Sequence, residues 1–238
     1  HYTTLLAKIK MEQNDFLKSS RFAPQFSARF KVFAQVDIDY WSAYLRLNYP
    51  WEFGFSNNLG GVKKMPKSYY SFLQALPVSI EGALPNSNYV YFLDQFFDYQ
   101  AGQIENKELS SNQLIEKYLT GEPAAYFKAK NLSIACHRGK AKKEGENIKA
   151  FIENNSYEIY NDVLRLVYNE AKGLEVGMKA PNFTLLDIEG KEVVLSELKG
   201  KVIYLDFWAT WCLPCLMQMK NSKSWKAKFK NKDIVFLY

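Results

Sequence analysis

Two cysteines near the end of the chain have the spacing of a reactive pair. Cys212 and Cys215 lie in the stretch FWATWCLPC, residues 207–215, with Trp211 before the first and Pro214 before the second. The 238 residues hold 3 cysteines, which is too few for the disulfide framework of a small secreted protein. A Cys-x-x-Cys pair is compatible with metal binding, with a structural crosslink, or with thiol chemistry.

A zinc site would need about four ligands. Besides the pair, the chain offers Cys136, His137 and the terminal His1. Cys136 and His137 are neighbours on an expected helix, so their side chains point in different directions. We therefore predict no metal and no cofactor, and we expect Cys136 to be a buried free thiol and His137 a surface residue.

The segments around the pair predict the elements that must position it. A continuous apolar run, KVIYLDFWA at residues 201–209, is typical of a buried strand. Residues 212–229 predict a helix that begins at the cysteines, and DIVFLY at residues 233–238 predicts another buried strand. Upstream, residues 183–198 predict two short strands about a turn at residues 189–190. The cysteines would then lie at the first turn of a β-α-β unit.

A helix that begins at the cysteines would favour a reactive thiolate. Free amide groups and a partial positive charge at a helix N-terminus lower the pKa of a thiol, to roughly 3.5–7.5 in known cases. We expect Cys212 to be the nucleophile at the tip and Cys215, more deeply buried, to resolve the mixed disulfide. Pro214 suits the first turn because it needs no amide partner, and Trp211 would shield the pair and offer an apolar surface to substrates.

Asp206 interrupts the apolar run, where a charge is costly. Strand alternation places it on the same face as Trp208. A buried carboxylate near Cys215 could accept its proton as a general base. The alternative is an aspartate at a strand end that is solvated or caps the helix.

Most of the chain has a different character. The hydrophobic content of 47% is sufficient for one large domain or two small ones. Residues 1–172 predict a mainly helical domain, residues 173–182 a linker rich in helix-breaking Gly and Pro, and residues 183–238 a second domain. Apolar residues at three- and four-residue steps, with Ser, Pro or Gly at the ends, predict helices at residues 24–50, 65–77, 86–103, 110–121, 122–139, 139–155 and 156–173.

The net charge of +6 raises the question of a nucleic-acid partner. Six lysines and no acidic residue lie in residues 220–232. Lysines near a helix C-terminus are typical of a solvated face, and no nucleic-acid motif accompanies them, so we predict no such partner. The apolar runs are too short to span a membrane. Because the sequence opens on His1 rather than Met, we expect the true start upstream, together with any targeting segment or membrane tether.

The stretch VIYLDFWATWCLPC, residues 202–215, resembles the active-site strand and turn of thioredoxin. Residues 177–202 resemble the opening segment of the extracytoplasmic thioredoxin-like thiol-disulfide oxidoreductases of bacteria, the TlpA/ResA type, which is shared in part with peroxiredoxins. The resemblance covers about residues 177–238. It implies a mainly α N-terminal domain followed by a partial α/β thioredoxin-like domain.

The resemblance also implies a role in cell redox homeostasis, in the periplasm or cell envelope of a bacterium. Its expected partners are protein thiols and disulfides and an electron-donor redox protein. Cys212 matches the attacking cysteine of the family and Cys215 its resolving cysteine, while Trp211 and Pro214 match its flanking residues. Asp206 matches the buried Asp of thioredoxin, where many exported relatives have Asn.

The sequence departs from the family at several places. Gln218 stands where relatives often have Glu, and Lys220 where they commonly have Pro. The chain ends after DIVFLY, so the remaining helix, strands and cis-Pro loop of the family are absent. We therefore expect these residues alone to be weakly active or inactive. We also expect the free edge of the strand before the cysteines to be covered by a further segment or by another chain.

Two other functions stay open on the residues alone. Peroxiredoxins place Thr or Ser three residues before the reactive cysteine and Pro seven before it, whereas this chain has Ala209 and Leu205. These mismatches disfavour a thiol peroxidase. The helical part could instead be a binding module that carries a redox-inactive thioredoxin-like fragment, although both cysteines of the pair are present.

Overall fold

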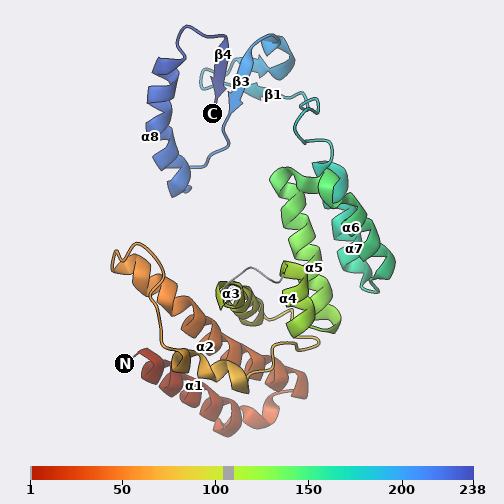
Figure 1. The fold of residues 1–238 in the computed structure, drawn as a ribbon. Coiled ribbons are helices and arrows are strands. Elements are labelled where there is room, and N and C mark those ends of the chain that lie inside the picture. Colours follow the sequence, from red (N-terminus) through yellow and green to blue (C-terminus); the bar gives the residue numbers. More distant parts are fainter. Residues whose placement is uncertain (1, 104–109) are drawn as a thin grey trace. The chain divides into compact units, whose positions relative to one another are not determined.

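The computed structural model of the protein describes residues 2–103 and 110–238. They form two compact units, His1–Val176 and Gly177–Tyr238 (Figure 1). The division lies within residues 173–182, the segment that the sequence predicts as a linker. None of the helices in the described residues is both long and apolar enough to cross a membrane.

The first unit consists of helices, as the sequence predicts. Its segment at residues 65–77 is a 3-10 helix, Lys67–Ala75, rather than an α-helix. A π-helical turn, Cys136–Lys140, follows α5, and Gly139 in it has the positive φ of 72° that few residues other than glycine adopt. The α-helices are α1 (Tyr2–Ser19), α2 (Ala28–Ser56), α3 (Ser87–Gln103), α4 (Ser111–Tyr118), α5 (Gly121–Ala135), α6 (Ala141–Asn154) and α7 (Glu158–Ala171).

Helix α2 continues beyond Pro50, so the prediction that it ends there is wrong. A proline inside a helix removes the amide that would donate to the carbonyl four residues earlier, here that of Arg46. The hydroxyl of Tyr69 donates to this carbonyl instead, at 2.8 Å. The carbonyl of Pro50 accepts the amide of Lys63 at 2.9 Å. Tyr69, which lies outside the helix, therefore supplies the donor that Pro50 removes.

Two clusters of buried side chains hold this unit together. The first joins α2, α3, α4 and α5, and the rings of Tyr89 and Phe92 pack edge-on against Tyr40 within it. The second joins α5, α6 and α7 around Ile148 and Leu164. Aromatic edge-to-face pairs add to the stabilisation that burial of apolar surface supplies.

The second unit contains the predicted hairpin and the predicted β-α-β unit. Strands β1 (Thr184–Leu186) and β2 (Glu192–Val194) are antiparallel, with Gly190 at a φ of 78° in the turn between them. Strand β3 (Val202–Leu205) is followed by α8 (Leu213–Lys228) and then by β4 (Ile234–Leu237), which is parallel to β3 in the register Val202 to Ile234 (Figure 1).

The strands are shorter and more exposed than the sequence predicts. Strand β3 ends at Leu205, and residues 206–209 have no regular structure. Both β3 and β4 are only half-buried or exposed along their length. In the described part of the chain β3 pairs with β4 alone, so the sheet has two strands and little covers its faces.

Candidate active site

The cysteine pair lies at the N-terminus of α8, as the sequence predicts. Cys212 is the N-cap residue, and Pro214 is the second residue of the helix. The first intrahelical hydrogen bond runs from the amide of Leu216 to the carbonyl of Cys212, at 3.0 Å. Proline costs nothing at this position, because the amides of the first turn have no helical partner.

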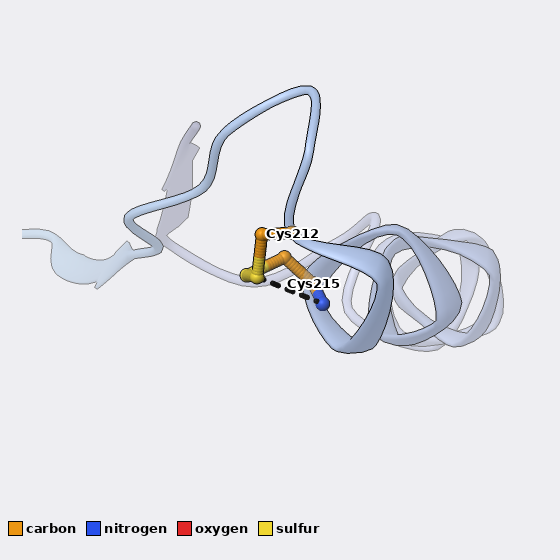
Figure 2. The surroundings of a disulfide bond; sticks show 2 residues. All are labelled: Cys212 and Cys215. Carbon is orange, nitrogen blue, oxygen red and sulfur yellow. Dashed lines mark hydrogen bonds between the residues drawn. A yellow bond between two sulfur atoms is a disulfide. The ribbon is translucent and has the colours of Figure 1, made fainter. Parts of the chain in front are cut away.

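A disulfide joins Cys212 to Cys215, whose Cα atoms lie 5.3 Å apart. Figure 2 shows the two sulfur atoms at the start of the helix and the amide nitrogen of Cys215 directed at the Sγ of Cys212. That amide donates to Sγ at a distance of 3.3 Å. The sulfur of Cys212 thus occupies the place that a Ser or Asp oxygen takes in a helix cap.

The capping contact favours negative charge on Cys212. When the disulfide is reduced, the same amide and the positive end of the helix dipole stabilise a thiolate relative to a thiol. A thiolate is the species that attacks disulfides. The geometry is therefore suited to a nucleophile at Cys212, with a second thiol one turn later.

The surface around the pair is apolar and open. The side chains of Trp211 and Phe207 are 86% and 83% exposed, and Leu213 and Met217 are exposed as well. The exposed ring of Trp211 is thus accessible as an apolar surface.

Neither cysteine of the pair is fully buried. Cys212 and Cys215 are both half-buried.

Asp206 is half-buried, so the prediction of a buried carboxylate is wrong. The prediction extended strand alternation through residue 208, but β3 ends at Leu205 and alternation has no meaning beyond it. The backbone amide of Asp206 donates to the carbonyl of Leu237 at 3.0 Å, which holds the residue at the end of the sheet. Among the described residues no hydrogen bond joins its carboxylate to Cys215.

The third cysteine lies in the helical unit. Cys136 is a free thiol, 2% exposed, and His137 beside it is exposed, which confirms both predictions. Burial raises the pKa of the Cys136 thiol, and the nearby charges of Glu144 and Glu175 raise it further. Cys136 is therefore a weak nucleophile. The described residues contain no group of three or more His, Cys, Asp or Glu side chains arranged to hold a metal ion.

The helical unit holds a second feature, a cavity beside Arg46, that the sequence pattern did not predict. Its lining comes from α1, α2 and residues 72–80, which are distant in sequence. The one local signal was Arg46 itself, the single charged residue of the apolar and aromatic stretch 40–51 in α2.

Comparison with known proteins places the similarity in the second unit. Residues 176–238 match the AhpC/TSA family. The chain is 39% identical over 67 residues to the thiol-disulfide oxidoreductase ResA of Bacillus cereus (strain ATCC 10987 / NRS 248), covering 28% of this chain and 39% of that protein. It is 38% identical over 78 residues to ResA of Bacillus subtilis (strain 168), covering 33% and 41%. It is 44% identical over 52 residues to ResA of Geobacillus thermodenitrificans (strain NG80-2), covering 22% and 30%.

The chain thus spans about two fifths of the length of the first curated relatives that it matches. No solved structure matches it. The matches confirm the thioredoxin-like character of the second unit and its similarity to thiol-disulfide oxidoreductases.

Proposed function

We propose that the protein is a thiol-disulfide oxidoreductase that exchanges disulfides with protein substrates through Cys212 and Cys215. The observation that carries the proposal is the capping contact, in which the Cys215 amide donates to the Cys212 sulfur at the start of α8. The similarity of the same unit to proteins named thiol-disulfide oxidoreductase supports it.

In the reducing direction the exchange has two steps. The Cys212 thiolate attacks one sulfur of a substrate disulfide, a mixed disulfide forms, and the other substrate sulfur leaves as a thiolate. Cys215 then loses its proton and attacks the Sγ of Cys212. The disulfide between Cys212 and Cys215 forms, the mixed disulfide breaks, and the second substrate thiolate leaves. The substrate gains two electrons, which a dithiol of an electron-donor redox protein restores to the pair.

Three further residues have proposed roles. Asp206, directly after β3, accepts the proton that Cys215 loses, either directly or through a water molecule. Trp211 presents an apolar face to the polypeptide that carries the substrate disulfide, as its exposure permits. Pro214 holds the first turn of α8, so that the amide of Cys215 keeps its direction.

We also propose that the protein works outside the cytoplasm, in the cell envelope of a bacterium. This proposal rests on the resemblance of residues 177–202 to exported oxidoreductases. Disulfides persist in such compartments, so an enzyme that exchanges them has substrates there. A tether upstream of residue 1 would hold it at the membrane.

Reduction of insulin by the complete protein, with dithiothreitol as electron donor, tests the function. We expect the protein to accelerate the reaction, the Cys212→Ser variant to abolish the acceleration, and the Cys215→Ser variant to accumulate a mixed disulfide with insulin. Cys136→Ala is the matched control and should leave the rate unchanged. Consumption of peroxide without insulin reduction would favour a thiol peroxidase, and absence of both activities would favour a redox-inactive module.

A further inference from the structure

A cavity of about 550 Å³ lies in the helical unit, between α1, α2 and residues 72–80. This volume lies within the range of roughly 300–1,000 Å³ that small-molecule sites occupy. Most of its wall is apolar, with Leu6, Val36, Leu76 and Ile80 among the lining residues. A few polar side chains interrupt this wall, and their charges do not cancel.

Two of the charged residues neutralise each other. The Nζ of Lys10 lies 2.6 Å from an oxygen of Asp39, and Gln35 donates to the other oxygen of that carboxylate at 3.0 Å. Both oxygens of Asp39 are thus occupied, and this corner of the cavity carries no net charge.

Arg46 has no such partner. The ion pairs of the described residues do not include it. Its guanidinium carbon lies 3.9 Å from the centre of the Phe72 ring, and its Nη2 donates to the carbonyl of Tyr69 at 3.1 Å. The ring face offsets part of the cost of burying the charge. The cavity is therefore left with one positive charge.

The Nε of Arg46 is buried and has no hydrogen-bond acceptor among the described residues. A buried donor without an acceptor destabilises a protein, and more so on a charged group. Arg46 is half-buried, and this partial burial without an anion beside it lowers the pKa of its guanidinium. A negatively charged group in the cavity would offset the cost of this charge.

We infer that this cavity binds a small amphiphilic monoanion, a carboxylate with an apolar tail, whose carboxylate accepts from Arg46 and whose tail lies against Val36, Leu76 and Ile80. A carboxylate matches the donor geometry of a guanidinium and neutralises its charge. A cationic ligand would meet a like charge, and an uncharged one would leave the charge of Arg46 unpaired. The inference concerns the helical unit and is independent of the proposed redox function.

Calorimetric titration of the complete protein with decanoate, below its micelle concentration, tests the inference. We expect one decanoate per chain, bound at least about tenfold more tightly than decanol, because a charge-assisted hydrogen bond is worth at least that factor. Arg46→Met should remove the preference for decanoate over decanol, and Arg46→Lys should keep part of it. Equal affinities for decanoate and decanol in the unaltered protein would overturn the inference, as would absence of binding.

A second pair of variants tests the inference if Arg46→Met does not fold. Ala7 is an exposed residue of α1 at the rim of the cavity, whereas its neighbour Lys8 is exposed but does not line it. We expect Ala7→Trp to fill the mouth of the cavity and displace part of the decanoate tail. Loss of the burial of about two methylene groups would weaken decanoate binding by at least about tenfold. Lys8→Trp adds the same ring outside the cavity and should bind as the unaltered protein does. Equal binding by both variants would overturn the inference.

Discussion

The backbone amide of Cys215 donates a hydrogen bond to the Sγ of Cys212 across 3.3 Å. One residue of the pair therefore provides the donor that would stabilise the other as a thiolate. The contact exists because Cys212 is the N-cap of α8, where the amides of the first turn have no helical acceptor. The capping contact therefore depends both on the three-residue spacing of the two cysteines and on a helix that begins directly after Cys212.

The first prediction concerns which thiol reacts. After reduction, Cys212 should be alkylated by iodoacetamide faster than Cys215 and Cys136 at roughly pH 6.5, because only its sulfur accepts a helix-capping amide. The raised pKa of Cys136 keeps that residue a thiol at this pH. Its alkylation rate should therefore begin to rise only at a higher pH than that of an ordinary cysteine. Mass spectrometry of peptides after short exposures measures the three rates.

The same experiment in urea serves as the control for alkylation. The three rates should become similar once the chain is unfolded, because burial and the helix N-terminus are then lost. A native protein in which Cys136 reacts first would contradict the assignment of Cys212 as nucleophile.

The second prediction concerns Asp206. If its carboxylate accepts the proton of Cys215, Asp206→Asn should slow resolution of the mixed disulfide more than its formation. We expect an effect of about tenfold to a hundredfold, the low end for general bases, since Asp206 is only half-buried. Stopped-flow measurement with the complete protein separates the two steps.

A matched control for Asp206 is available at the other end of the sheet. Asp233 is an exposed carboxylate directly before β4, and because β3 and β4 are parallel it lies at the end away from the cysteines. Asp233→Asn should leave both steps unchanged. Equal slowing of formation and resolution by Asp206→Asn would remove its role as a base.

The third prediction concerns the second edge of β3. The amides of Val202 and Asp206 donate to carbonyls on the β4 side, so strand alternation directs the amides of Ile203 and Leu205 to the other edge. An apolar strand edge without a partner tends to pair. We expect the amides of Ile203 and Leu205 to exchange about as slowly as those of Val202 and Asp206, because a further strand covers this edge. Amide hydrogen exchange followed by NMR measures this.

Exchange at Val202 and Asp206 provides the reference for this comparison. Their acceptors lie within the described residues, so these two amides should exchange slowly whether or not a strand covers the other edge. Fast exchange at Ile203 and Leu205 in the complete protein would show that no strand covers that edge.

The fourth prediction concerns Pro50 within α2. Tyr69→Phe removes the hydroxyl that donates to the Arg46 carbonyl, and should lower the free energy of unfolding by about 1–2 kcal/mol. In a Pro50→Ala background an amide can donate to that carbonyl, so the same Tyr69→Phe change should cost little. Urea denaturation of the four proteins gives the coupling energy. Equal costs in the two backgrounds would contradict the proposed replacement.

Much of the second unit could be predicted because its signals are local. The apolar run, the turn with Gly190, and the helix that begins at Cys212 each depend on residues adjacent in sequence. The same is true of the capping box at the start of α4, where Ser110 and Gln113 bond to each other's backbone amides. The sequence alone thus determined the cysteine pair, its position on a helix, and the helical character of the first unit.

The tertiary structure decided what depends on contacts between distant segments. Helix α2 passes through Pro50 because Tyr69, in another segment, supplies the missing donor. Trp211 is exposed and Asp206 half-buried because the sheet of this unit has two strands, which no local pattern reports. Arg46 is left without an anion because Asp39, the one carboxylate that lines the same cavity, pairs with Lys10 of α1. Burial and charge pairing depend on which segments surround a residue. The separation of two segments in the sequence does not indicate whether they lie close together in space.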